Sequence, residues 1–156
     1  MPQNQELRDL VAKMKLIPNR AIIESRKMVF LDDSIVRGTQ LKDNTIDLRR
    51  SGAAEVHMRI ACPPLLYPCV FLNFSQSRSP LELAGRKAIF QLEGDGAELS
   101  DYSDPDSEKY QKMVDKIAET LNLDSLMYQR LDDLVEAIGL PKEKLCTHCW
   151  DGTSFY

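Results

Sequence analysis

The sequence predicts an α/β protein that begins with a parallel sheet and continues into a mostly helical C-terminal extension. Two apolar segments, residues 27–31 and 54–61, have the composition of buried strands. Between them, residues 39–51 carry apolar side chains near helical spacing, and Gly52 follows where a helix would end. A strand, a helix and a strand in this order form a βαβ unit, so the two strands should be parallel.

Further elements are expected along the rest of the chain. Residues 79–94 begin with Ser-Pro and end with Gly, as a capped helix does. An acidic loop at 95–107 precedes an amphipathic helix whose apolar face contains Tyr110, Met113, Val114, Ile117 and Leu121. A short strand at 125–131, a short helix at 132–139 and an irregular tail complete the prediction. Residues 4–16, closed by Pro18, could form either a frayed helix or a mobile loop.

Composition limits the classes of function. The chain has 156 residues, 43% of them hydrophobic, which suits one folded domain and argues against global disorder. Its net charge of −4 argues against broad attraction to nucleic acid or anionic membranes. No apolar run is long enough to span a bilayer, and the polar N-terminus lacks a signal core. We therefore expect a cytoplasmic protein.

The segment "MVFLDDSIVRGT" contains the residues that indicate a ligand site. A strand followed by a turn into a helix creates an anion site, because the first helical N–H groups have no internal partner. Gly38 allows the backbone to approach a phosphate, and Ser34 and Thr39 offer hydroxyls. Acidic residues also cap helices, and glycine also ends turns. The buried strand before Asp32 and Asp33, with Gly-Thr after them, favours a ligand site.

The two aspartates should face a different part of the same ligand, because a carboxylate repels phosphate. Adjacent carboxylates suit vicinal hydroxyls or a hydroxyl-bound Mg²⁺. A sugar phosphate satisfies both requirements, with ribose hydroxyls on Asp32 and Asp33 and the 5′-phosphate on the turn.

This composite resembles the phosphoribosyl pyrophosphate motif of the type I phosphoribosyltransferases, and "DDSIVRGT" resembles its form in the amidophosphoribosyltransferase family. Three other stretches agree in order. "PQNQELRDLVAKMKL" resembles the flexible catalytic loop, "SGAAEVHMRIACPPLLYPC" the following strand and proline-rich loop, and "KLCTHCWDG" a C-terminal cysteine pair. The resemblance implies a partial Rossmann-like phosphoribosyltransferase domain at residues 1–93, with an acidic linker, helical extension and cysteine-containing tail at 94–156.

The resemblance also implies roles for individual residues. Asp32 and Asp33 would bind the ribose hydroxyls and Mg²⁺, and a second Thr of many members is replaced by Gln40. Arg8, Lys13 and Lys15 would belong to the loop that closes over the diphosphate. The 5′-phosphate would be held, mainly through backbone N–H groups, by Ser34, Ile35, Val36, Arg37, Gly38 and Thr39.

Four cysteines leave several interpretations open. Cys146 and Cys149 form a C-x-x-C pair, which suits zinc or an iron–sulfur cluster, and spacing alone does not choose between them. The family resemblance implies a [4Fe–4S] cluster on Cys69, Cys146 and Cys149, with a fourth ligand from sequence that is absent here. Cys62 is a possible substitute, although its surroundings are more typical of a buried thiol. An incomplete site, empty or holding Zn²⁺, is the alternative.

The implied reaction is displacement of pyrophosphate from phosphoribosyl pyrophosphate by glutamine-derived ammonia, giving 5-phosphoribosylamine in the first step of purine biosynthesis. The family's glutaminase half uses an N-terminal cysteine, but here residue 2 is Pro and no cysteine precedes Cys62. We therefore expect a C-terminal enzyme fragment, either self-associating as a homo-oligomer or completed by a missing N-terminal portion. The competing hypotheses are a non-catalytic phosphoribosyl- or nucleotide-binding module and a small cysteine metal-binding protein.

Overall fold

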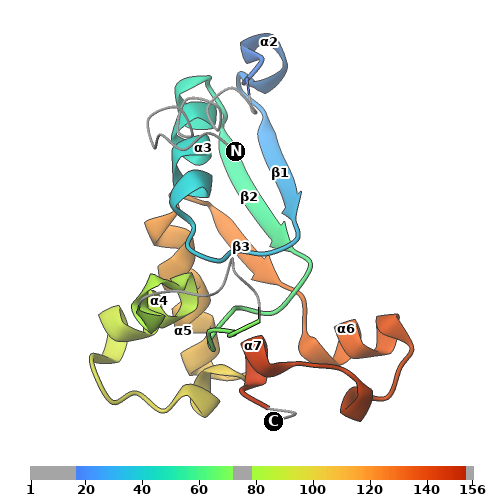
Figure 1. The fold of residues 1–156 in the computed structure, drawn as a ribbon. Coiled ribbons are helices and arrows are strands. Elements are labelled where there is room, and N and C mark those ends of the chain that lie inside the picture. Colours follow the sequence, from blue (N-terminus) through green and yellow to red (C-terminus); the bar gives the residue numbers. More distant parts are fainter. Residues whose placement is uncertain (1–16, 72–78, 154–156) are drawn as a thin grey trace.

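The sheet is the centre of the fold, and it is parallel, as predicted. The structure, a computed structural model, describes residues 17–71 and 79–153. Its three strands are β1 (Lys27–Asp32), β2 (Glu55–Ile60) and β3 (Ser125–Tyr128). They lie in the order β1-β2-β3, and both neighbouring pairs are parallel (Figure 1). The predicted loop residues Arg8, Lys13 and Lys15, and the element expected at 4–16, lie outside the described residues.

The βαβ unit is confirmed. Helix α3 (Thr39–Arg50) connects β1 to β2 and buries Thr45 and Leu48. The register pairs Lys27 with Glu55 and continues in step to the end of both strands. A short helix, α2 (Arg20–Ile23), precedes β1, and the side chain of Asn19 caps its N-terminus.

Side chains alternate along β2 between a buried face and an open face. Val56, Met58 and Ile60 are all buried, whereas the residues between them are only partly covered. The buried face forms one core with α3 and with α5 (Glu108–Thr120), whose inward side chains include Met113 and Ile117. Both long helices therefore stabilise the same side of the sheet.

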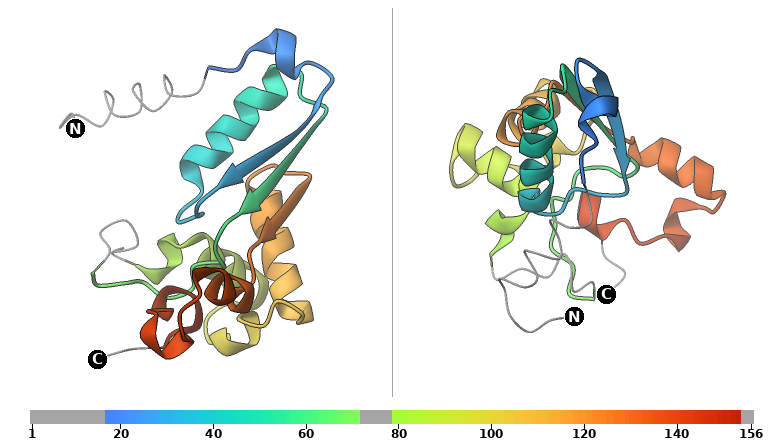
Figure 2. Two further views of the ribbon diagram at one scale, coloured as in Figure 1. Left: turned by 90° about the vertical axis from the view of Figure 1, so that its right-hand side faces the viewer. Right: turned by 90° about the horizontal axis from the view of Figure 1, so that it is seen from above.

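The remaining helices gather beyond the carboxyl ends of the strands. They are α4 (Ala84–Glu93), α6 (Leu131–Ile138) and α7 (His148–Asp151), with 3₁₀ turns η1 (Pro80–Glu82), η2 (Leu99–Tyr102) and η3 (Lys142–Lys144). Figure 1 and the left view of Figure 2 both place α2 at one end of the molecule and α4 and α7 at the other. Among the residues described, no helix has the length and apolarity needed to cross a bilayer.

Three sequence predictions need correction. The helix expected at 79–94 begins only at Ala84, because Ser79 caps the separate 3₁₀ turn η1 instead. The third strand ends at Tyr128 rather than at residue 131, because α6 already begins at Leu131. The tail is also not wholly irregular, since it contains α7. The hydroxyl of Thr147 donates to the Asp151 carboxylate, and the backbone N–H groups of Leu66 and Tyr67 donate to the Cys149 carbonyl at 2.9 and 3.1 Å. These contacts dock a helix too short to be recognised from periodicity.

Candidate functional site

The predicted site lies at the edge of the sheet where all three parallel strands end. Asp32 closes β1, and its carbonyl accepts the Ala61 N–H at 3.0 Å just past the end of β2. The Ile60 carbonyl accepts the Gln129 N–H at 2.9 Å just past the end of β3. The strand ends are therefore aligned, and both aspartates lie at the edge where open α/β sheets bind their ligands.

The segment Ser34–Gly38 forms a turn between β1 and α3. It is called the phosphate loop below, after the group that the sequence predicts it to bind. Gly38 has φ +75° and precedes the first residue of α3. In the described structure no side chain caps this helix, so its first N–H groups are available to an anion. Ile35 is only 4% exposed and anchors the loop in the core. The loop therefore combines a buried anchor, Ile35, with an uncapped helix N-terminus.

Each of the two carboxylates accepts a hydrogen bond from the residue that follows it in the chain. The Asp33 N–H donates to Asp32 Oδ1 at 2.9 Å, and the Ser34 hydroxyl contacts Asp33 Oδ1 at 3.4 Å. Partial enclosure by protein atoms raises the pKa of Asp32 above its usual range, and the carboxylate of Asp33 acts in the same direction. The Asp33 N–H opposes this shift. Such a pair of carboxylates can accept hydrogen bonds from hydroxyl groups or can bind a cation.

The loop also contacts the chain that begins α4, which sequence patterns did not indicate. Arg37 Nη2 lies 2.9 Å from Glu82 Oε2, and the Ala84 N–H donates to the Val36 carbonyl at 2.8 Å. The partners are more than 40 positions apart in the sequence, so only the fold brings them together. Glu82 is the residue near the site that the sequence reasoning missed.

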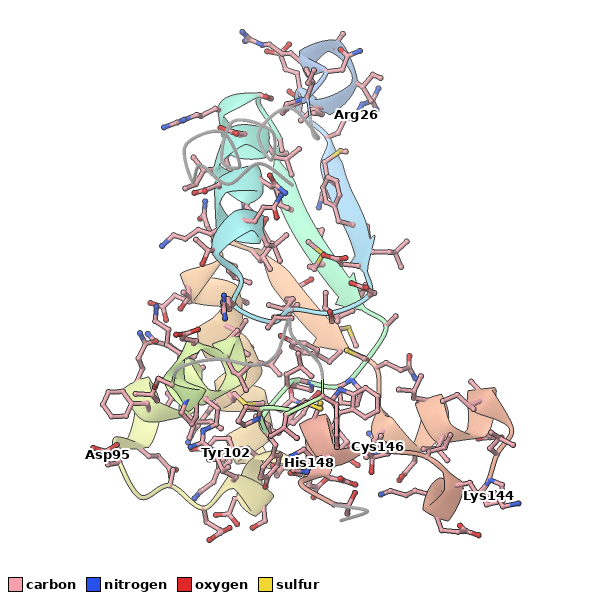
Figure 3. All side chains as sticks on the ribbon, in the orientation of Figure 1. Arg26, Asp95, Tyr102, Lys144, Cys146 and His148 are labelled. Atoms are coloured by element: carbon pink, nitrogen blue, oxygen red, sulfur yellow. The ribbon has the colours of Figure 1, made fainter. Side chains whose placement is uncertain are left out.

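The four cysteines are free thiols, two at the ends of the proline-rich loop and two in the tail. The Cys69 and Cys149 thiols are in contact, and burial raises the pKa of Cys149 to about 11. Burial likewise raises the pKa of Cys62 to about 11. Cys146 is exposed and lies just before α7, which begins at His148 (Figure 3).

These thiols do not form a metal site in the described structure. Within residues 17–71 and 79–153, no group of three Cys, His, Asp or Glu side chains is arranged to hold a metal ion. The fold brings together Cys69 and Cys149 of the predicted cluster set, but the set with Cys146 is not in ligating geometry.

A separate pocket lies on the far side of the proline-rich loop. Its lining includes Pro63, Tyr110, Arg130 and Trp150, but none of the residues of the phosphate loop. Arg130 is occupied by an ion pair with Asp106, with two contacts of 2.7 and 2.8 Å. The pocket is therefore not the predicted ligand site.

Comparison with known proteins identifies relatives of the chain. It is 33% identical, over 95% of its length, to an amidophosphoribosyltransferase of Methanothermobacter thermautotrophicus, and covers 26% of that protein. It is 35% identical, over 95% of its length, to the chloroplastic amidophosphoribosyltransferase 3 of Arabidopsis thaliana, and covers 23% of it. The chain thus spans about a quarter of the length of these curated relatives and corresponds to their C-terminal part. No model of a protein family matches the sequence.

Solved structures agree with this relationship. The fold matches a glutamine phosphoribosylpyrophosphate amidotransferase from B. subtilis complexed with ADP and GMP, with a TM-score of 0.64 and 26% identity. That match covers 98% of this chain and 29% of the other. A second match, an allosteric regulatory enzyme of purine biosynthesis, has a TM-score of 0.62 at 24% identity, covers 98% of this chain and 28% of the other, and supports the fold alone.

Proposed function

We propose that this chain, a homologue of the C-terminal part of the amidophosphoribosyltransferases over nearly its whole length, supplies the ribose 5-phosphate half of a phosphoribosyl pyrophosphate site. The observation that carries the proposal is the aligned strand edge, where Asp32 and Asp33 stand beside a turn that leads into an uncapped helix N-terminus. The C-terminal edge of a parallel sheet is where such ligands bind. Residues 34–39 would receive the 5′-phosphate on backbone N–H groups.

The two aspartates would bind the ribose hydroxyls, at the end of the sugar opposite the 5′-phosphate. Their carboxylates would accept hydrogen bonds from the ribose 2′- and 3′-hydroxyls, and Mg²⁺ bound there would neutralise charge on the pyrophosphate. The chain's own contribution is to hold the ribose ring at both ends, with the 5′-phosphate on α3 and the hydroxyls on Asp32 and Asp33. Holding both ends would fix C1 for displacement of pyrophosphate by ammonia. In this proposal the product is 5-phosphoribosylamine, and the ammonia arises from glutamine elsewhere in the complete enzyme.

Binding of ribose 5-phosphate tests the proposal directly. Isothermal titration with and without Mg²⁺ should show saturable binding to the wild-type chain. Replacing both aspartates, Asp32→Asn with Asp33→Asn, should abolish the Mg²⁺-dependent part of the affinity. The chain offers a matched control in a second adjacent pair, Asp132 and Asp133, in the first turn of α6.

The same double substitution at the control pair should leave binding unchanged. Equal loss in both double variants, or absence of binding to the wild type, would refute the proposal. A turnover assay with phosphoribosyl pyrophosphate and ammonia would then separate an active fragment from a binding module.

A [4Fe–4S] cluster or Zn²⁺ on Cys69, Cys146 and Cys149 is a second part of the proposal. The contact between Cys69 and Cys149 supports it, and Cys62 is a possible fourth ligand. Anaerobic reconstitution with iron and sulfide should give cluster absorbance in the wild type that is lost in Cys69→Ser. Metal analysis of the untreated protein would detect Zn²⁺, and unchanged absorbance in Cys69→Ser would count against these ligands.

Two further parts of the proposal follow from the relatives. The boundary between a phosphoribosyltransferase part at 1–93 and an extension at 94–156 stays a prediction, although β3, from the second part, forms the third strand of the sheet. We also retain the cytoplasm as the expected location, noting that two relatives from Arabidopsis thaliana carry chloroplastic names.

A further inference from the structure

Two contacts join the phosphate loop to the start of α4. The ion pair between Arg37 and Glu82 links the loop to η1, and the Ala84 N–H donates to the Val36 carbonyl two residues further along the chain. Leu83, between the two contacting residues, is fully buried. The side of the loop that faces η1 is therefore attached to a segment that is itself fixed in the core.

The position of Glu82 is unfavourable for anion binding if charge alone is considered. A carboxylate close to a phosphate site repels the ligand, and an arginine paired with a carboxylate has less positive charge to offer. The ion pair is half-exposed, with side chains 49% and 36% accessible, so its direct contribution to folding stability is small. Its geometry instead fixes the direction of the Arg37 side chain and the backbone that follows it.

We propose that Glu82 is a positioning residue for the phosphate loop and acts through Arg37. The inference rests on the proposed function, since the ligand is the sugar phosphate of that site. With Arg37 held on Glu82 and Val36 held by Ala84, the N–H groups of residues 37–39 keep the orientation that an anion requires. Glu82 thus increases affinity for the ligand in spite of its negative charge.

The direction in which Glu82→Gln changes the affinity for ribose 5-phosphate distinguishes a positioning role from simple charge repulsion. Removing a negative charge near the loop would tighten ribose 5-phosphate binding if charge alone mattered. A positioning role predicts weaker binding, by roughly two- to fivefold, the range expected for one exposed ion pair. The matched control is Glu24→Gln, which breaks the exposed Arg20–Glu24 pair of 2.8 Å at the opposite end of the sheet and should leave affinity unchanged.

A double-mutant cycle tests whether Glu82 acts through Arg37. If it does, Arg37→Gln and Glu82→Gln combined should weaken binding no more than the stronger single variant. Additive losses would show that the two side chains act independently and would overturn the inference, as would an unchanged or tighter affinity in Glu82→Gln.

Hydrogen exchange gives a readout that needs no ligand. The Ala84 amide, which donates to the Val36 carbonyl at 2.8 Å, should exchange faster in Glu82→Gln than in wild type, whereas amides of β2 should not change. Failure of the wild type to bind ribose 5-phosphate would refute the proposed function, but the positioning role would still be judged by exchange. Unchanged exchange of the Ala84 amide would overturn it.

Discussion

Gly38 shows how a single residue sets the geometry of the phosphate loop. Its φ of +75° lies in the left-handed region, where a side chain costs about 1 kcal/mol. A Cβ built there would also lie 2.8 Å from Leu121 Cδ2. The turn therefore needs glycine both for its conformation and for its close approach to the end of α5.

Replacing Gly38 with Ala should weaken both folding and ligand binding. We expect a loss of about 1–2 kcal/mol in the free energy of unfolding, from the strained φ and the contact with Leu121. Urea denaturation and ribose 5-phosphate titration measure the two effects. Gly139→Ala is the control, because Gly139 has a nearly identical φ of +74° and no atom within 4 Å of the added Cβ.

The control should lose only the conformational part of the stability and keep the affinity of the wild type. Equal affinity in Gly38→Ala and Gly139→Ala would show that the loop tolerates a side chain.

Asp32 gives a second test at the residue scale. Its raised pKa means that, as pH falls, this carboxylate takes up a proton earlier than an ordinary aspartate. Mg²⁺-dependent binding should therefore decline at a higher pH than free aspartate would predict. Carbon-detected NMR titration of the carboxyl group measures this pKa directly.

The variant Asp33→Asn separates the causes of the shift. It should lower the pKa of Asp32, because a like charge is removed, but the value should stay above that of free aspartate because enclosure is the largest cause. An unshifted pKa of Asp32 in the wild type would contradict both proposed causes.

At the scale of elements, Asp124 lies directly before β3 and contacts both β2 and α3 at the edge where the strands begin. Its carboxylate accepts the Val56 N–H of β2 at 2.6 Å and pairs with Arg49 of α3. Its own N–H donates to the Val56 carbonyl at 2.9 Å, just before β3 begins. The Val56 N–H on the carboxylate, and after it the Arg49 guanidinium, lower the pKa of Asp124 below its usual value.

Replacing Asp124 with Asn should cost about 1 kcal/mol of unfolding free energy at neutral pH, since a charge-assisted hydrogen bond becomes a neutral one. Because the pKa of Asp124 is lower in the folded state, its charged carboxylate stabilises the fold. This stabilisation is complete at pH above the pKa of an unfolded aspartate, about 3.9, and is lost as pH falls through the pKa of the folded state. The difference between wild type and variant should therefore shrink in the most acidic buffers. Asp115→Asn, on the exposed side of α5, makes the same change of charge without these contacts and is the control for stability at neutral pH.

The elements that sequence patterns predicted best are those with long, regular apolar periodicity. The βαβ unit and α5 were visible from the spacing of residues such as Leu48, Met113 and Ile117, all of which are buried. The end of β3 was misplaced because α6 already begins at Leu131. The presence of α7 was not visible, because it depends on contacts such as Thr147 with Asp151 and Leu66 with Cys149. The Arg37–Glu82 pair was invisible for the same reason, since no local pattern links residues so far apart.

At the scale of the whole molecule, one face of the sheet is open in the described structure. The register places Val29 and Leu31 on the same side as His57 and Arg59, and Met127 beside Arg59. Val29, Leu31 and Met127 are 60%, 85% and 58% exposed. Parallel sheets are normally covered on both faces, and β1 is also an edge strand. We therefore expect the isolated chain to self-associate through this face or to require a further polypeptide that covers it.

A single charge on the open face should test this expectation. Leu31→Lys places an ammonium group where an apolar partner would otherwise dock, so burying the face would require desolvating that charge. Sedimentation velocity over a range of concentrations should show association of the wild-type chain that shifts to roughly tenfold higher concentration in the variant. Leu140→Lys makes the same chemical change at a half-exposed leucine after α6 and should associate like the wild type. Because both variants gain the same net charge, weaker self-association in both would reflect general charge repulsion. A wild-type chain that stays monomeric at high concentration would show that the open face drives no association.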